Sequence, residues 1–325
     1  MSQDPGVRRS RDVPSLVKAA RDGDPRAVAR LITLVENNDS ALREVAAALA
    51  PYTGTAQIIG LTGSPGVGKS TTTNELVRAF RATGRRVGIL AVDPSSPFTG
   101  GAILGDRVRM QDHATDPGVY IRSMSSRGHL GGLSAATPQA ARVLEGAGCD
   151  LVIVETVGVG QAEVDVIDHA DSIVLVLIPG SGDSIQALKA GVMEIPDIIV
   201  VNKADRDGAD ATYRDIQSMI GLGERAPGQW RPHVVRATAS KGEGIDDIVA
   251  TVDKHRAWLE DSGELRKRRE LRAAAEVEAI TLGALRERIG TLRHGEALTN
   301  LAAKVADGEL DPYAAADQLL SSLTD

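Results

Sequence analysis

A glycine-rich loop that ends in lysine and serine is the strongest chemical signal in this sequence. Such a loop between a strand and a helix binds phosphates, because its glycines let backbone N–H groups converge on phosphate oxygens. The positive end of the following helix adds to this attraction. Lys69 neutralises phosphate charge, and the Ser70 hydroxyl is placed to ligate Mg²⁺. We expect Lys69 to be a solvent-facing charge. The loop and its first helical residues are Gly63, Ser64, Pro65, Gly66, Val67, Gly68, Lys69, Ser70 and Thr71.

A second motif, Asn202-Lys203-Ala204-Asp205, follows the apolar run Ile198 to Val201. The Asp205 carboxylate can accept hydrogen bonds from N1–H and the C2 amine of guanine. Adenine lacks this donor pair and would leave the carboxylate unpaired, which favours GTP over ATP. Asn202 can bond the Hoogsteen edge of the base and hold the loops together, and the Lys203 stem can cover the ring. A weaker signal, for backbone amides that bond guanine O6, comes from Thr238, Ala239 and Ser240.

Acidic residues follow other apolar runs. Asp93 ends the run that starts at Val87, Asp106 lies in a glycine-flanked loop, and Glu155 ends the run that starts at Leu151. Carboxylates at the carboxyl ends of strands are suited to Mg²⁺ and its waters, since hard cations prefer oxygen ligands. Asp93 and Asp106 also suit loop caps and turns. The candidate Mg²⁺ residues are Ser70, Asp93, Asp106 and Glu155.

The residues expected to act in hydrolysis depart from the spacing found in small signalling GTPases. Gly158 can offer its N–H to the γ-phosphate, but Gln161 comes three residues later, whereas small signalling GTPases carry glutamine directly after the glycine. This spacing predicts slow intrinsic turnover. Residues 179–183 form a glycine-rich segment, followed by Lys189, that looks like an additional switch or else a plain connection between strand and helix.

The apolar runs alternate with helical stretches, which predicts an α/β fold with a mainly parallel sheet. The runs are Ile58 to Leu61, Val87 to Val92, Leu151 to Val154, Ile173 to Ile178, Ile198 to Val201 and Val234 to Val235. Helical spacing before them and after them predicts three parts: an N-terminal helical extension (1–54), a P-loop domain (55–260) and a C-terminal helical arm (261–325). Asp24-Pro25 and Asp311-Pro312 are typical helix starts.

Composition excludes several classes. The formal net charge of -7 over 325 residues argues against a general nucleic-acid surface, which needs a basic excess. A single cysteine, Cys149, excludes an intramolecular disulfide, and no apolar run is long enough to span a bilayer. We therefore expect a cytoplasmic protein without nucleic-acid or membrane partners.

Five segments together resemble the MeaB/ArgK family of G-protein chaperones for adenosylcobalamin-dependent methylmalonyl-CoA mutase. The segments are GSPGVGKST, AVDPSSPFTGGAILGDRVRM, ETVGVGQAEVDVIDHAD, LIPGSGDSIQALKAG and NKAD. The resemblance implies a Mg²⁺-dependent GTPase that gates cofactor loading onto the mutase and protects or reactivates it. It also implies a C-terminal arm that forms a homodimer, and a third switch from Gly180 to Lys189 that reads the mutase. A mutase acting on another acyl-CoA is the alternative partner.

The sequence leaves two alternative functions to compare with this one. A metal-delivering GTPase needs thiolate or imidazole clusters, but Cys149 is alone and the six histidines show no ligand spacing. A kinase or ATPase linked to arginine or ornithine transport would need a phosphoacceptor site, which no motif supplies. The basic segment from Arg266 to Arg272 is interrupted by Glu270 and is typical of a solvated helix face.

Overall fold

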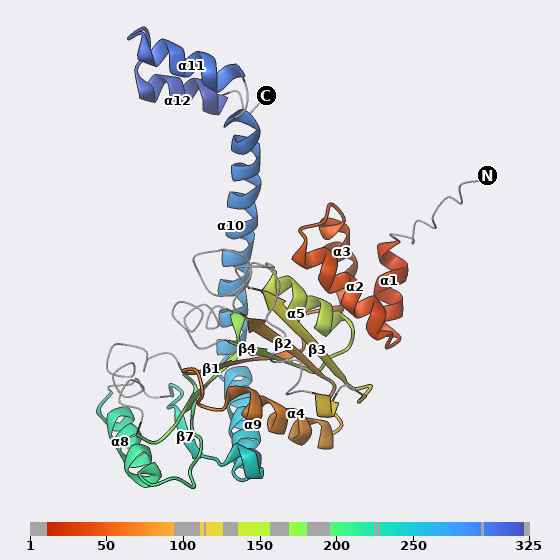
Figure 1. Cartoon of the computed structure of the whole chain (residues 1–325), viewed down its shortest axis with the longest axis vertical. Coiled ribbons are helices and arrows are strands. Elements are labelled where there is room, and N and C mark those ends of the chain that lie inside the picture. Colours follow the sequence, from red (N-terminus) through yellow and green to blue (C-terminus); the bar gives the residue numbers. More distant parts are fainter. Residues whose placement is uncertain are drawn as a thin grey trace, which may run out of the picture. The chain divides into compact units, whose positions relative to one another are not determined.

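A computed structural model describes residues 12–93, 111–113, 115–125, 136–156, 169–180, 196–223, 226, 228–293 and 296–321. Within these residues, seven parallel strands form one sheet in the order β3-β2-β4-β1-β5-β6-β7. Figure 1 shows this sheet, with β1 to β4 and β7 labelled. The α/β fold and the six expected strands are confirmed. The strands are β1 (Gln57–Thr62), β2 (Val87–Asp93), β3 (Val119–Ser125), β4 (Leu151–Glu155), β5 (Ser172–Leu177), β6 (Ile198–Val201) and β7 (His233–Arg236).

Helices cover both faces of the sheet, and alternate strand residues point to opposite faces. Leu151 and Ile153 of β4 pack with α4 (Lys69–Ala82) and α9 (Ile245–Asp261) on one face. Val152 and Val154 pack with α5 (Thr137–Gly146) on the other. Leu175 and Leu177 of β5, with Ile199 and Val201 of β6, pack with α8 (Ala209–Leu222) on that second face. The parallel strands bring their carboxyl ends to one edge of the sheet.

The N-terminal extension consists of α1 (Val13–Arg21), α2 (Pro25–Glu36) and α3 (Leu42–Leu49), followed by the short helix η1 (Ala50–Tyr52). The expected start of α2 is confirmed, since Asp24 accepts a hydrogen bond from Arg26 N at 2.8 Å. These helices share a core with α5. Glu145 of α5 accepts hydrogen bonds from the successive amides of Gly54, Thr55 and Ala56, and so fastens the linker that enters β1.

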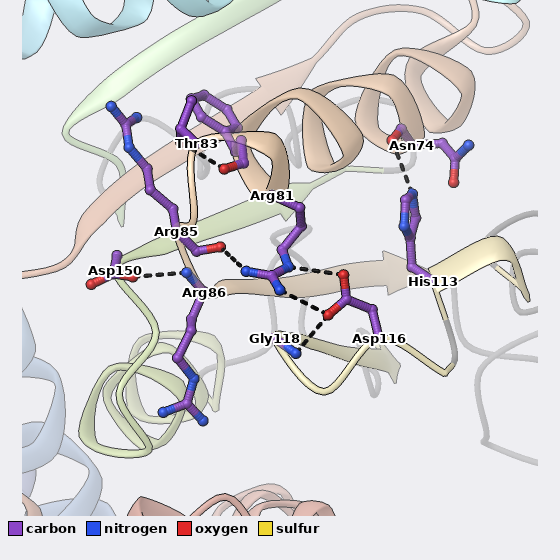
Figure 2. Close-up of polar contacts among 10 residues, drawn as sticks. Asn74, Arg81, Thr83, Arg85, Arg86, His113, Asp116, Gly118 and Asp150 are labelled. Atoms are coloured by element: carbon purple, nitrogen blue, oxygen red, sulfur yellow. Dashed lines mark hydrogen bonds and ion pairs between the residues drawn. The ribbon is translucent and has the colours of Figure 1, made fainter.

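The edge strand β3 is not among the strands expected from apolar runs. The short helix η2 (Gln111–His113) precedes it, and the His113 Nε2 atom lies 3.1 Å from the Asn74 carbonyl oxygen on α4. Arg81 of α4 makes two hydrogen bonds to Asp116, each of 2.9 Å, and a third to the Arg85 carbonyl (Figure 2). The chain that enters β3 is thus fastened to the helix that begins at the phosphate loop.

The chain divides into two compact units, residues 1–265 and 266–325. The second contains most of α10 (Glu264–Arg293), α11 (Glu296–Ala306) and α12 (Pro312–Ser321). Asp311 caps α12 as expected, accepting from Tyr313 N at 2.9 Å. Leu271, Leu282 and Leu285 on α10 are exposed. No helix in the described part of the chain combines the length and the apolar character needed to cross a bilayer.

Candidate functional site

The glycine-rich loop lies between β1 and α4, as the motif requires. Two of its glycines are needed for steric reasons. A Cβ on Gly63 would lie 2.2 Å from the Val176 carbonyl oxygen, and one on Gly68 would lie 2.5 Å from Asn202 Nδ2. Both glycines have positive φ, +139° and +99°, which other residues rarely adopt. The loop therefore packs against the ends of β5 and β6 at a distance that only glycine allows.

Lys69 is buried, with 7% of its surface exposed. Its Nζ donates hydrogen bonds to the carbonyl oxygens of Gly63 at 2.6 Å and Ser64 at 3.1 Å. The expectation of a solvent-facing charge was wrong. The buried ammonium group needs hydrogen-bond acceptors, and the two loop carbonyls supply them.

Ser70 and Glu155 meet next to the loop, although 85 residues separate them in sequence. Ser70 donates its hydroxyl hydrogen to Glu155 Oε1 at 2.6 Å. Thr73, one helical turn further along α4, donates to Glu155 Oε2 at 2.8 Å. Glu155 and Thr73 are both buried. Thr73 is not among the residues predicted from the sequence, although a hydroxyl three residues after Ser70 on a helix is the available signal.

The structure does not describe five of the expected site residues in full. The backbone of Asp93 ends β2, but its side chain is not described. Asp106, Gly158, Gln161 and Lys189 lie outside the described residues. Their roles, like those of the proposed third switch beyond Gly180, stay predictions.

The Asn202 side chain joins the two predicted binding loops. Its Nδ2 donates to the Val67 carbonyl at 2.8 Å, and its Oδ1 accepts from Ala239 N at 3.1 Å. Asn202 is buried, with 2% of its surface exposed. The expected link between the loops is therefore present. The NH₂ group carries a second hydrogen beyond the one given to Val67, so the contact with the Hoogsteen edge stays a prediction. The Ala239 amide, a candidate donor to guanine O6, is bonded to Asn202.

Lys203 extends from the same turn towards the phosphate loop. Its backbone has φ +55°, an uncommon value for a residue other than glycine. Ala204 N donates to the Ala237 carbonyl at 3.0 Å, and Lys203 Nζ donates to the Gly66 carbonyl at 2.8 Å. Lys203 therefore links the base motif to the phosphate loop, and its covering of a base stays a prediction.

Asp205 is exposed at the same edge and forms an ion pair with Lys241, with 3.0 Å between Oδ2 and Nζ. The hydrogen bond from Lys241 lowers the pKa of Asp205, and the same contact raises the pKa of Lys241. Thr238 and Ser240 flank this region in the loop after β7, with Thr238 buried and Ser240 exposed. Lys241 was missed because nothing in the local sequence relates it to Asp205.

Soft metal ligands do not gather anywhere in the part of the chain that the structure describes. No group of three or more His, Cys, Asp or Glu side chains converges there. Cys149 is buried before β4, and burial raises the pKa of its thiol to about 12, so it stays protonated. A protonated, buried thiol is a poor metal ligand.

The fold and this edge of the sheet define a P-loop NTPase. The family model described as methylmalonyl-CoA mutase-associated GTPase MeaB matches residues 28–293, and the chain belongs to this family. A protein of Pyrococcus abyssi is 47% identical over 315 residues, covering 96% of this chain and 97% of the relative. The mouse protein named methylmalonic aciduria type A homolog, mitochondrial, is 34% identical, covering 97% of this chain and 80% of that protein.

The solved structure of an LAO/AO transport system kinase is also similar. It is 29% identical to this chain and has a TM-score of 0.67, with 96% of this chain and 98% of that chain covered. The similarity extends over nearly the whole of both chains, so it includes the helical extension and the P-loop fold together.

Proposed function

We propose that this MeaB-family protein binds and hydrolyses GTP with Mg²⁺. We further propose that it acts as a chaperone of an adenosylcobalamin-dependent mutase of the methylmalonyl-CoA type, gating its cofactor loading, protection and reactivation. The observation that carries the nucleotide proposal is the Asn202 side chain, which joins the phosphate loop at Val67 to the base loop at Ala239. The mutase proposal rests on the family to which the chain belongs.

The residues present fit a Mg²⁺ ion. Ser70 and Glu155 place a hydroxyl and a buried carboxylate oxygen 2.6 Å apart at the start of α4, and Thr73 orients the carboxylate. Oxygen donors of this kind suit a hard cation that keeps part of its hydration shell. Ser70 and Glu155 would hold the ion, with Asp93 and Asp106 as the further candidates. When bound, Mg²⁺ neutralises charge on the phosphate oxygens.

The chain's own groups would act in three ways. Backbone amides of the loop and Lys69 would bind the β- and γ-phosphates, with the Lys69 ammonium transferred from loop carbonyls to phosphate oxygens. Asp205 would accept from guanine N1–H and the C2 amine, while Lys203 covers the ring. Gly158 and Gln161 are proposed to position the γ-phosphate and the attacking water, a step that a partner protein accelerates.

The first test changes the base that the site reads. In Asp205→Asn, the amide can donate to the C2 carbonyl of xanthine, so preference should shift from GTP towards XTP by about ten- to a hundredfold. Competition binding of GTP, XTP and ATP measures this shift. Asp207→Asn, an exposed residue two positions away with the same charge change, is the matched control and should keep GTP preference. Unchanged GTP preference in Asp205→Asn would contradict guanine reading by Asp205.

The same variant also tests the mutase proposal without interference from contaminating GTPases. We expect the wild type to hydrolyse GTP slowly, and Asp205→Asn to hydrolyse XTP slowly. Both reactions should be faster when the cobalamin mutase is added. Stimulation of XTP hydrolysis can come only from the altered site. Equal turnover with and without the mutase in both pairs would refute the chaperone proposal and leave the nucleotide proposal standing.

A kinase linked to amino-acid transport is the second candidate, because a similar solved structure carries that name. Transfer of labelled γ-phosphate distinguishes the two. We expect the label to appear as free phosphate, whereas a labelled protein or amino acid would support the kinase.

A further inference from the structure

We propose that Lys241 is a positioning residue for guanine recognition, holding the Asp205 carboxylate in the orientation in which it accepts the base. This inference rests on the proposed reading of guanine by Asp205. Its basis is a contact between two loops that come from different strands: Asp205 follows β6, and Lys241 follows β7. The Lys241 Nζ lies 3.0 Å from Asp205 Oδ2.

The Lys241 backbone is held firmly enough to serve as an anchor. Lys241 ends the short helix η5 (Ala239–Lys241), where its N–H donates to the Thr238 carbonyl at 2.8 Å. Thr238 N donates to the Glu243 carbonyl at 2.9 Å, which closes the loop with an isolated antiparallel bridge. A Cβ on Gly244 would lie 2.2 Å from the Arg236 carbonyl, so the loop also packs closely on its own strand.

The Asp205 side leaves more freedom to the side chain. Asp205 lies in a turn whose backbone is held by Asn202 and Ala204, but 40% of its own side chain is exposed. Without a partner, an exposed carboxylate rotates about its terminal torsion, which has a broad energy profile. The ion pair with Lys241 restricts that rotation before the base arrives.

Lys241 and guanine can share the carboxylate. An ionised aspartate offers two oxygens with about four acceptor positions, so Oδ2 can accept from Lys241 while the two oxygens accept from guanine. Charges around the pair agree with this arrangement. The contact with Lys241 lowers the pKa of Asp205, and the charge of Arg206 lowers it as well. The charge of Glu243 raises the pKa of Lys241. The pair thus favours the ionised form of Asp205, which is the form that accepts from two guanine donors.

The test is a double-mutant cycle on GDP affinity. Lys241→Met keeps the apolar stem and removes the charge, and should weaken GDP binding by about two- to tenfold. In the Asp205→Ala background the same change should have little effect, because there is no carboxylate left to position. Lys241→Arg retains a cationic donor and should recover most of the affinity. Lys254→Met, an exposed lysine on α9, is the matched control and should bind GDP like wild type.

The outcomes separate this inference from the proposal beneath it. If Lys241→Met weakens GDP binding equally with and without Asp205, Lys241 supports only the loop, and the inference is wrong. An unchanged GDP affinity in Lys241→Met also overturns it. If Asp205→Ala itself leaves GDP affinity unchanged, guanine reading by Asp205 fails, and the positioning role fails with it.

Discussion

At the scale of single residues, the site depends on hydroxyl and amide groups that hold other groups in place by hydrogen bonds. Thr73 makes no expected contact with nucleotide, yet its hydroxyl, like that of Ser70, donates to the buried Glu155 carboxylate. Asn202 has a comparable role for the loops. The motif that contains Asn202 predicted its role, whereas Thr73, which supports Glu155, lies outside every motif.

Thr73→Val tests this support directly. The substitution keeps the shape of the side chain but removes one donor to a buried carboxylate, so the free energy of unfolding should fall by about 1 to 3 kcal/mol. The Mg²⁺ concentration needed for tight GDP binding should rise, because Glu155 loses its orientation. Chemical denaturation and Mg²⁺ titration of GDP binding measure the two effects.

A matched control lies next to it in sequence. Thr72 is equally buried, but its hydroxyl donates to the Gly68 carbonyl at 2.9 Å within the helix. Thr72→Val should leave the Mg²⁺ dependence unchanged. If Thr72→Val and Thr73→Val shifted this dependence alike, the effect would belong to α4 and not to the contact with Glu155.

At the scale of elements, α4 links the phosphate loop to the edge of the sheet. The helix begins at Lys69 and, near its other end, Arg81 binds Asp116 before β3 (Figure 2). The sequence predicted α4 but not β3, because Arg122, Ser123 and Ser125 interrupt the apolar run. Its pairing with β2 and the burial of Tyr120 and Met124 make this segment a strand. As an edge strand it needs less apolar surface than the central ones.

The Arg81–Asp116 pair predicts a dependence of stability on pH. The hydrogen bond from Arg81, and then that from Gly118 N, lower the pKa of Asp116. A carboxyl whose pKa is lower in the folded state contributes stability that is fully present above its unfolded value, about 4. This contribution is lost as pH falls through the folded pKa.

Urea unfolding at several pH values between about 5 and 3 checks this prediction. The free energy of unfolding should decrease with falling pH in the wild type, and the decrease should be smaller in Asp116→Asn. Asp215→Asn, on an exposed residue of α8, should retain the wild-type slope. An identical slope in Asp116→Asn would show that the pair does not couple folding to this proton.

At the scale of the whole molecule, the P-loop fold does not explain the exposed apolar side chains of the C-terminal unit. Leu271, Ala275, Leu282 and Leu285 recur at helical spacing on α10 and are exposed in the single chain. Apolar side chains on one face of a helix require a partner surface. We propose a second copy of this chain as that partner, so that the arm forms a homodimer.

Truncation after Gly263 removes α10 to α12, and light scattering should then show a monomer, whereas the full chain should be a dimer. In the full chain, Leu271→Glu with Leu282→Glu should also give a monomer. Val277→Glu with Ile280→Glu, on the other side of the helix at 100° per residue, should leave a dimer. A dimer that survives the truncation would exclude the arm as the interface.

The sequence alone determined the class of the fold, the phosphate loop, the base motif and the family resemblance, because each is written in contiguous residues. G-x-x-x-x-G-K-S and N-K-x-D depend on local backbone geometry at strand ends, which short patterns specify. Buried parallel strands were equally readable as apolar runs.

Only the tertiary structure decided which groups meet across the chain. Glu155 meets Thr73 across 82 residues, and Asn202 meets Val67 across 135. The burial of Lys69 and the pairing of Asp205 with Lys241 depend likewise on how the loops at one edge of the sheet are packed. Such contacts follow from strand order, and no local pattern records whether β4 or β6 lies beside the loop after β1.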